Sequence, residues 1–315
     1  MVEILLDGVD ESRRELALRD LEDVLSHASG LEPLIDKIIV AKDFRGVVRS
    51  YGGPADYESV HEYGYAVAKT LSTRKNNELR FTIVVNGETC RSWDDCMILD
   101  RHRTIWHELT HISDDAQRAD AIGLDAFFSE PSNKKQVFLK SAWSIWVEYH
   151  AERVFAESIS KVIARKPDLK YDFFAETKEY VRRLGELIDD LRNYLNANAT
   201  SALKREVEFE EAVGRVTSRL TGILFLTAYV RSKADLDARL KASVLELKKK
   251  QNYLRFLSQD LDSIAGLLDK LFAHSGEYRE DLLDRMGIPL DSIFRRCGVT
   301  IRDLNGKYLI NLRPV

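Results

Sequence analysis

Several features are scarce in this 315-residue chain, and each scarcity excludes a class of protein. The three cysteines are odd in number and form no C-x-x-C pair, so we expect free thiols in a reducing compartment rather than a disulfide framework. No apolar run is long enough to span a bilayer, which takes about 20 residues. The N-terminus lacks the basic segment of a signal peptide, so we expect a cytoplasmic protein without a membrane segment.

Proline, glycine and net charge are low as well. Six prolines and 16 glycines favour a helix-rich fold with few long loops. The formal net charge of −4 gives no electrostatic reason to expect nucleic acid as a partner. Hydrophobic residues make up 44% and charged residues 31%, as in globular proteins, and this length accommodates one large domain or two.

Histidine is also scarce, with seven residues in the chain, yet two of them fall in one short motif. Residues 107–111 read His-Glu-Leu-Thr-His, which is the HExxH pattern. On a helix, residues at i and i+4 lie on the same face, so the two imidazoles converge on one point and can bind a zinc ion at about 2.0–2.1 Å. Glu108 can then reach water activated by zinc and act as a general base.

The residues around the motif favour a buried helix. Ser92 to Asp95 have the S-x-x-[DE] form of a capping box, which predicts a helix start just before Cys96. A broad apolar surface follows, supplied by Ile98, Leu99, Ile105, Trp106, Leu109 and Ile112. Buried histidines need partners, and a metal ion satisfies both at once. The alternative is an accidental match on a solvated helix face, and the apolar surface argues against it.

A catalytic zinc site needs a third protein ligand, and a second predicted helix offers two carboxylates. Within residues 146–156, Glu148 and Glu152 lie at i and i+4 and therefore share one face. We expect Glu148 to bind the metal, with Glu152 one turn away accepting the outer N–H of a zinc-bound histidine. The alternatives are Glu152 as the ligand, or an exposed acidic helix edge without any metal.

The sequence combines HELTH with a later helix that carries E-x-x-x-E, in which alanine precedes the second acid. This combination resembles the gluzincin branch of zincin metallopeptidases, with a minigluzincin-like catalytic core. The resemblance covers about residues 37–160. It implies three ligands for Zn²⁺, which are His107, His111 and Glu148. It also implies that Glu108 is the catalytic base and that Glu152 supports the ligand glutamate.

The N-terminal half of the sequence predicts a small sheet and a helix before the motif. The helix carries leucine and valine at helical spacing over residues 16–25. Short β-branched runs predict strands at 37–42, 47–51 and 79–85, with a weaker candidate at 65–68. An extended peptide could add to an edge of this sheet by backbone hydrogen bonds and so align a peptide bond near the metal.

The C-terminal half has a different pattern. Helical periodicity over 171–195, 204–230 and 235–272 predicts a bundle, and residues 298–312 predict a β-hairpin around Asn305 and Gly306. The expected fold is therefore α+β, with a zincin-like core followed by a mainly helical bundle and a C-terminal β-hairpin. We expect a metallopeptidase domain with its N-terminal helix at 1–160 and a helical domain at 161–315.

Together these features predict a zinc-dependent peptidase that hydrolyses peptide bonds of an intracellular protein or peptide. Four residues are candidates for stabilising the oxyanion or contacting substrate, and these are Tyr149, Arg153, Tyr63 and Tyr65. The alternative is a regulatory, partner-binding protein on a metallopeptidase-like scaffold with little turnover. Glu108 favours the enzyme, because zinc binding alone does not need a base. An aminopeptidase is disfavoured, because the G-x-M-E-N pattern is absent upstream.

Overall fold

In the computed structural model of the full chain, the described residues are 2–28, 30–53, 60–61, 64–65, 67–90, 98–165, 173–204, 209–234, 236–237, 239–243, 254–305 and 307–312. The chain divides into two compact units, Met1–Ser129 and Glu130–Val315. The first contains a small sheet with helices, and the second is mainly helical with a C-terminal hairpin, so the fold is α+β as predicted. The boundary predicted at residue 160 lies inside a helix of the second unit.

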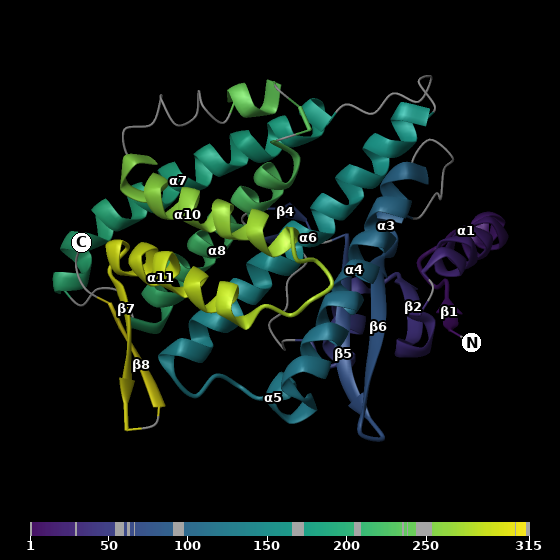
Figure 1. Cartoon of the computed structure of the whole chain (residues 1–315), viewed down its shortest axis with the longest axis horizontal. Helices are drawn as coiled ribbons and strands as arrows, with labels where there is room; N and C mark the ends of the chain where they lie inside the picture. The colour runs from purple at the N-terminus through teal and green to yellow at the C-terminus, as the bar shows by residue number, and fades with distance from the viewer. Residues whose placement is uncertain are drawn as a thin grey trace. The chain divides into compact units, whose positions relative to one another are not determined.

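The first unit is built on a four-stranded sheet in the order β1-β2-β6-β5 (Figure 1). Strands β1 (Glu3–Leu5), β2 (Ile35–Ala41) and β6 (Glu78–Asn86) run parallel. Strand β5 (Ala68–Lys75) forms one edge and runs antiparallel to β6. The strands predicted at 37–42 and 79–85 are confirmed as β2 and β6. Both are largely buried, as central strands with helices on either side must be.

Helices cover both faces of this sheet. Helices α1 (Arg14–His27), which was predicted, and α4 (Ile98–Ile122) share one face, where Leu21, Ile83 and Leu109 belong to one apolar cluster. Helix α2 (Phe44–Ser50) packs on the opposite face, where Val48 joins Ile39. Successive side chains of a strand point to opposite sides, so the consecutive apolar residues of β2 and β6 make both faces apolar. A short helix, α5 (Leu124–Phe128), follows α4.

The strand predicted at residues 47–51 is wrong, because residues 44–50 form helix α2. The Asp43 carboxylate accepts a hydrogen bond from the backbone N–H of Gly46 at 3.0 Å and so caps the first turn. Phe44 and Val48 lie one turn apart and are both buried against the sheet. The cap and this apolar face outweigh the β-propensity of adjacent valines.

The weak strand predicted at 65–68 also differs from the structure. A short ladder pairs β3 (Val60–His61) with β4 (Gly64–Tyr65), and the longer strand β5 then begins at Ala68. A tight turn joins β5 to β6, and its residues Asn76 and Asn77 have positive φ angles of 51° and 63°. Asparagine tolerates this left-handed conformation, and two such residues in succession match the twist of a two-residue hairpin.

The carboxyl end of β6 is fixed by a close backbone contact. Asn86 and Gly87 lead into the short helix α3 (Gly87–Cys90), and the Asn86 side chain accepts a hydrogen bond from the Glu88 N–H at 3.0 Å. A Cβ on Gly87 would lie 2.6 Å from the Cα of Gly8, and a Cβ on Gly8 would lie 2.7 Å from the Cα of Gly87. Only glycine fits at these two positions without a backbone shift.

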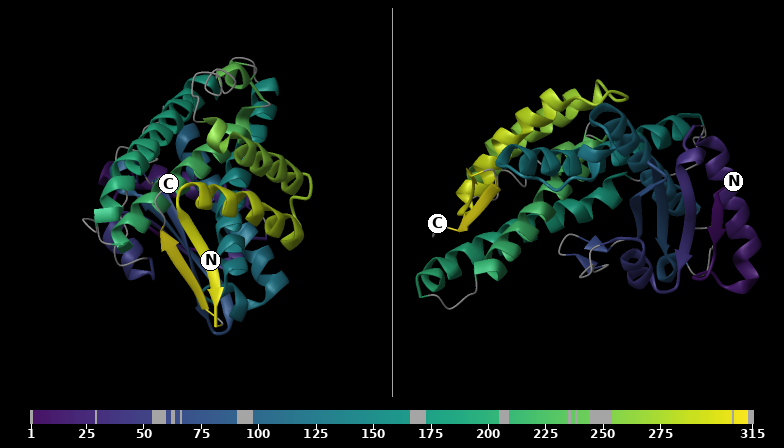
Figure 2. Two further views of the ribbon diagram at one scale, coloured as in Figure 1. Left: turned by 90° about the vertical axis from the view of Figure 1, so that its left-hand side faces the viewer. Right: turned by 90° about the horizontal axis from the view of Figure 1, so that it is seen from below.

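The second unit contains three long helices, α6 (Lys134–Arg165), α7 (Phe173–Lys204) and α8 (Phe209–Ala234). Helix α8 packs against both α6 and α7 (Figure 2). The helices predicted at 171–195 and 204–230 are confirmed as α7 and α8. In the segment 235–272, the described C-terminal part forms α10 (Leu254–Phe272).

The C-terminal hairpin is confirmed as well. Helix α11 (Glu280–Arg296) leads into β7 (Val299–Leu304) and β8 (Lys307–Leu312), which pair antiparallel (Figure 2). Asn305 in the connecting turn has a φ of 49°, the left-handed conformation that such a turn requires. Cys297, just before the hairpin, is a free thiol as predicted, and burial raises its pKa to about 12.

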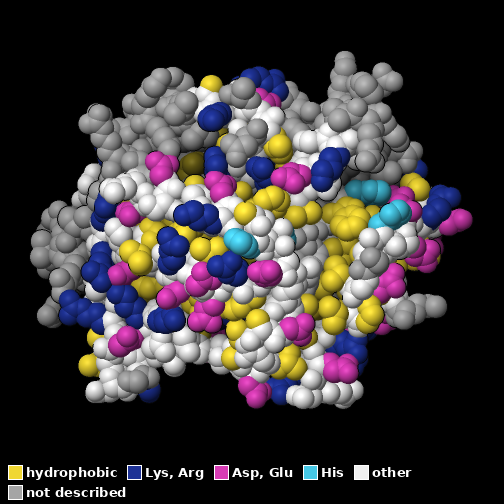
Figure 3. Space-filling view, in the orientation of Figure 1, with side chains coloured by type: hydrophobic (Ala, Val, Ile, Leu, Met, Phe, Trp, Pro, Cys, Tyr) yellow, Lys and Arg dark blue, Asp and Glu magenta, His cyan; other side chains and the backbone are white. Residues whose placement is uncertain are grey.

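Side chains of both charges and hydrophobic side chains all reach the face of the molecule that Figure 3 shows. None of the described helices is both long enough and apolar enough to cross a membrane. Figure 3 shows Lys and Arg side chains interspersed with Asp and Glu over the face in view. Several ion pairs among the described residues lie within one helix, such as Arg215 with Glu211. Exposed pairs of this kind each contribute about 0–1 kcal/mol.

Candidate metal centre

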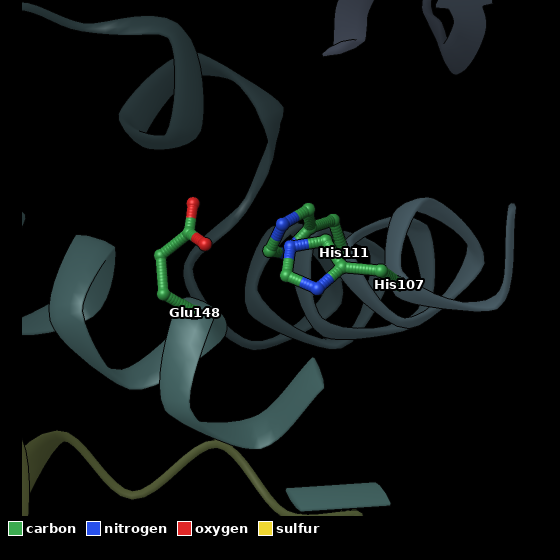
Figure 4. A group of neighbouring side chains, drawn as sticks. All are labelled: His107, His111 and Glu148. Carbon is green, nitrogen blue, oxygen red and sulfur yellow. The ribbon is translucent and has the colours of Figure 1, made fainter. Parts of the chain in front are cut away.

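The HExxH motif lies in the middle of helix α4, as predicted. Ile105, Leu109 and Ile112 bury the apolar side of this helix in the core of the first unit. His107 and His111 are partly buried, and their ring centroids lie 4.5 Å apart with an angle of 89° between the planes (Figure 4). The two imidazoles are therefore neighbours on one helix face, as their spacing requires, and can approach a single ion.

Glu108 is held by a residue of the edge strand. Its carboxylate is buried, with 6% of the residue exposed, and Oε2 accepts a hydrogen bond from the Thr70 hydroxyl at 2.7 Å. Thr70 belongs to β5, which packs against α4. A buried carboxylate needs such a donor, and the bond restricts the rotamers that Glu108 can adopt. The glutamate of the motif is thus fixed by an element outside its own helix.

Glu148 comes from helix α6, which includes the predicted helix at 146–156. One ligand atom from each of His107, His111 and Glu148 lies within 4.8 Å of the other two (Figure 4). Two imidazole nitrogens and one carboxylate oxygen form a donor set that zinc accepts in catalytic sites. The three side chains form a group that could hold a metal ion.

The Glu148 carboxylate also has a partner on helix α8. The Tyr229 hydroxyl donates a hydrogen bond to Glu148 Oε2 at 2.7 Å. Burial, together with the negative charges of Glu148 and Glu152, raises the pKa of the Tyr229 phenol well above its usual value. Tyr229 therefore stays protonated at neutral pH and acts as a hydrogen-bond donor.

Glu152, one turn along α6, forms a buried ion pair with helix α8. Its Oε2 lies 2.6 Å from Lys233 Nζ, and the side chains of Lys233 and Glu152 are 0% and 5% exposed. The Lys233 ammonium also lies 5.3 Å from the centre of the Tyr180 ring, and the Tyr180 and Tyr229 rings are 5.5 Å apart. The hydrogen bond from a zinc-bound histidine to Glu152 stays a prediction.

Two further candidates on α6 make contacts with other helices of the second unit. Tyr149 is buried and donates a hydrogen bond to Asp269 of α10 at 2.9 Å, and burial followed by the Asp269 charge raises its pKa. Arg153 pairs with Glu157 at 3.0 Å and donates to the backbone carbonyl of Ser232 at 3.2 Å. Their contact with substrate stays a prediction.

Other predicted features lie outside the part of the chain that the structure describes. These are Tyr63, the side chain of Tyr65, whose backbone belongs to β4, and the capping box at Ser92 to Asp95. The first described residue of α4 is Ile98.

Three residues that contact the proposed base or the two acids of α6 were not predicted, and these are Thr70, Tyr229 and Lys233. The Asn76-Asn77 pair is the sequence signal from which the strand that contains Thr70 could have been predicted. A hairpin turn at this place requires a strand just before it, and that strand contains Thr70. Tyr229 and Lys233 repeat the i, i+4 spacing of the two acids, but spacing does not tell which helices pair.

Comparison of the chain with family models, with curated proteins and with solved structures finds no match. The side chains around the HExxH motif and their geometry are therefore the basis for assigning a function.

Proposed function

We propose that the chain is a zinc-dependent metallopeptidase of the gluzincin kind, with a zincin-like core. The observation that carries the proposal is the HExxH motif on a buried helix, with two imidazoles 4.5 Å apart and the glutamate between them held at 2.7 Å by Thr70. A site that only binds metal needs the histidines but not an ordered glutamate, so the position of Glu108 supports catalysis.

Zinc fits the proposed ligands, because His107, His111 and Glu148 offer the imidazole and carboxylate donors that catalytic zinc sites use. When bound, zinc supplies a Lewis acid that polarises a carbonyl group and lowers the pKa of water. Glu108 takes the proton of the attacking water and delivers it to the leaving amine. Thr70 holds the Glu108 carboxylate in place, so that little reorganisation is needed during the reaction.

The edge strand supports a peptide as the substrate class. Strand β5 forms one edge of the sheet and carries Thr70, which contacts the proposed base. A peptide that pairs with such an edge by backbone hydrogen bonds is held in an extended conformation. The edge then recognises the backbone of the peptide more than any one of its side chains. A peptide bond held along β5 would lie close to Glu108.

Metal analysis combined with peptide cleavage tests the proposal. The purified chain should contain an equimolar amount of zinc and should cleave members of a peptide library. Glu108→Gln should keep the zinc and lose cleavage by about 10²–10⁴-fold, because an amide cannot accept the proton. His107→Ala should lose both zinc and cleavage. Elemental analysis and mass spectrometry of the peptide products give the two readouts.

Glu15→Gln is the matched control, because Glu15 is exposed on helix α1 and the substitution makes the same chemical change. It should leave zinc content and cleavage unchanged. A chain that binds zinc but cleaves no peptide would support a partner-binding protein on this scaffold instead. A wild-type chain without bound metal would contradict the whole site.

A further inference from the structure

Helices α6 and α8 of the second unit contact each other through two matched pairs of polar side chains. Glu148 and Glu152 are separated by four residues on α6, and Tyr229 and Lys233 are separated by four residues on α8. Tyr229 contacts Glu148 at 2.7 Å, and Lys233 contacts Glu152 at 2.6 Å. Four residues advance a helix by about 6 Å, so two contacts at this spacing fix the rotation and the register of one helix against the other.

The two acids have partners of different charge, and this difference separates their roles. The Lys233 ammonium neutralises Glu152, and a carboxylate that is paired with a buried cation is a poor ligand for a second cation. The Tyr229 phenol donates a hydrogen bond to Glu148, and a neutral donor of this kind orients a carboxylate without cancelling its charge. The contacts on α8 therefore favour Glu148 over Glu152 as the metal ligand.

The Tyr229 contact also restricts how Glu148 can bind. The hydroxyl occupies one lone pair of Oε2 and so limits the directions from which this carboxylate can meet a metal ion. Hydrogen bonds of this kind commonly fix the orientation of ligating carboxylates, and their loss weakens metal binding by about 10–100-fold.

We propose that Tyr229 is a positioning residue for the metal ligand Glu148, so that α8 orients the carboxylate that completes the zinc site. The inference rests on the proposed function, because it requires that the chain binds a metal through Glu148. It also gives helix α8 a part in the metal site, which the sequence pattern of that helix did not suggest.

Zinc affinity of Tyr229→Phe tests the inference. The substitution removes one oxygen and keeps the ring that lies 5.5 Å from Tyr180. Affinity for Zn²⁺, measured by competition with a chromophoric chelator, should fall about 10–100-fold, while the melting temperature of the metal-free protein stays close to that of the wild type. In the Co²⁺-loaded protein, the visible absorption bands should change in position and intensity, because they depend on the coordination geometry.

Tyr194→Phe is the matched control. Tyr194 lies on α7, its ring contacts Arg219 of α8 at 5.0 Å, and the substitution removes the same hydroxyl group. This variant should bind zinc like the wild type. A second control places Tyr229→Phe in a Glu148→Ala background, where it should have no further effect on zinc affinity, because its partner is gone.

The outcomes separate this inference from the proposed function. Wild-type zinc affinity in Tyr229→Phe, equal losses in Tyr194→Phe, or a further loss in the Glu148→Ala background would each overturn the role of Tyr229 while leaving the metal site intact. Absence of zinc binding in the wild type would overturn both proposals. A loss confined to Tyr229→Phe that depends on Glu148 supports the inference.

Discussion

A hydrogen bond joins Glu108 of helix α4 to Thr70 of strand β5, and this bond holds the carboxylate of the proposed base in position. The donor is a side-chain hydroxyl on the edge strand, and the acceptor is a buried carboxylate on α4. Hydrogen bonds to charged groups stabilise by about 1.5–3 kcal/mol, which corresponds to roughly 10–100-fold in an equilibrium or a rate.

Thr70→Val tests this contact at the scale of one residue. Valine has nearly the same shape as threonine but no hydroxyl, so the carboxylate loses its donor and can leave its productive rotamer. We expect kcat/KM for peptide cleavage to fall about 10–100-fold with unchanged zinc content. Steady-state kinetics together with metal analysis measure both effects.

Thr73→Val on the same strand is the control, because its hydroxyl contacts the Arg80 backbone carbonyl at 3.4 Å rather than Glu108. It should keep wild-type cleavage. An unchanged rate in Thr70→Val would show that the Thr70 contact does not support the base.

At the scale of elements, the β5–β6 hairpin depends on its asparagine turn. Asn77 has a φ of 63°, a conformation that costs about 1–2 kcal/mol for an ordinary L-residue. Its side chain also accepts a hydrogen bond from Arg74 Nε at 3.2 Å. The turn determines where the edge strand ends and therefore the register with β6 that brings Thr70 to Glu108.

Asn77→Ala should lower the free energy of unfolding by about 1–2 kcal/mol relative to Asn77→Gly, as measured by urea denaturation. Both variants lose the contact with Arg74, so the difference between them isolates the backbone conformation. Equal stabilities of the alanine and glycine variants would mean that the turn does not keep its positive φ in solution.

Long helices, central strands and the C-terminal hairpin could be predicted from the sequence, whereas helix α2 and the edge strand β5 could not. The parallel strands β2 and β6 contain apolar runs at 38–41 and 83–85, and α7 and α8 have long helical periodicity, so these patterns indicate their structures clearly. The two adjacent valines at 47 and 48 predict a strand, whereas the Asp43 cap and a buried apolar face produce helix α2. Strand β5 is largely polar, because it lies at an edge, and an edge strand lacks the apolar pattern that reveals central strands.

The candidate site was predictable only where its chemistry is local. His107, Glu108 and His111 form one motif on one helix, so their spacing reveals their relation. Glu148 could be proposed because a zinc site needs a third ligand. Tyr229 and Lys233 contact α6 through tertiary packing across many residues of sequence, and no local pattern encodes that pairing.

At the scale of the whole molecule, metal binding should raise stability. A ligand that binds only the folded state stabilises it by about 2.7 kcal/mol at a free concentration 100 times its dissociation constant. Removal of zinc with EDTA should therefore lower the melting temperature, and added Zn²⁺ should restore it. Differential scanning fluorimetry of the treated and reconstituted protein measures the shift.

His107→Ala provides the comparison for this experiment. The variant should melt at the same temperature with and without EDTA, because it lacks one of the proposed ligands. A chelator effect of equal size in His107→Ala would place the stabilising metal elsewhere in the chain.

The buried pair of Glu152 and Lys233 has a consequence for how the chain can change in evolution. Replacing one partner leaves the other charge buried and uncompensated, which costs about 3–5 kcal/mol, whereas replacing both with apolar residues is often tolerated. Single changes at either position would therefore be removed by selection, and accepted changes would come in pairs. In any set of descendants of this sequence, positions 152 and 233 should covary, and that covariation would mark the α6–α8 contact without a structure.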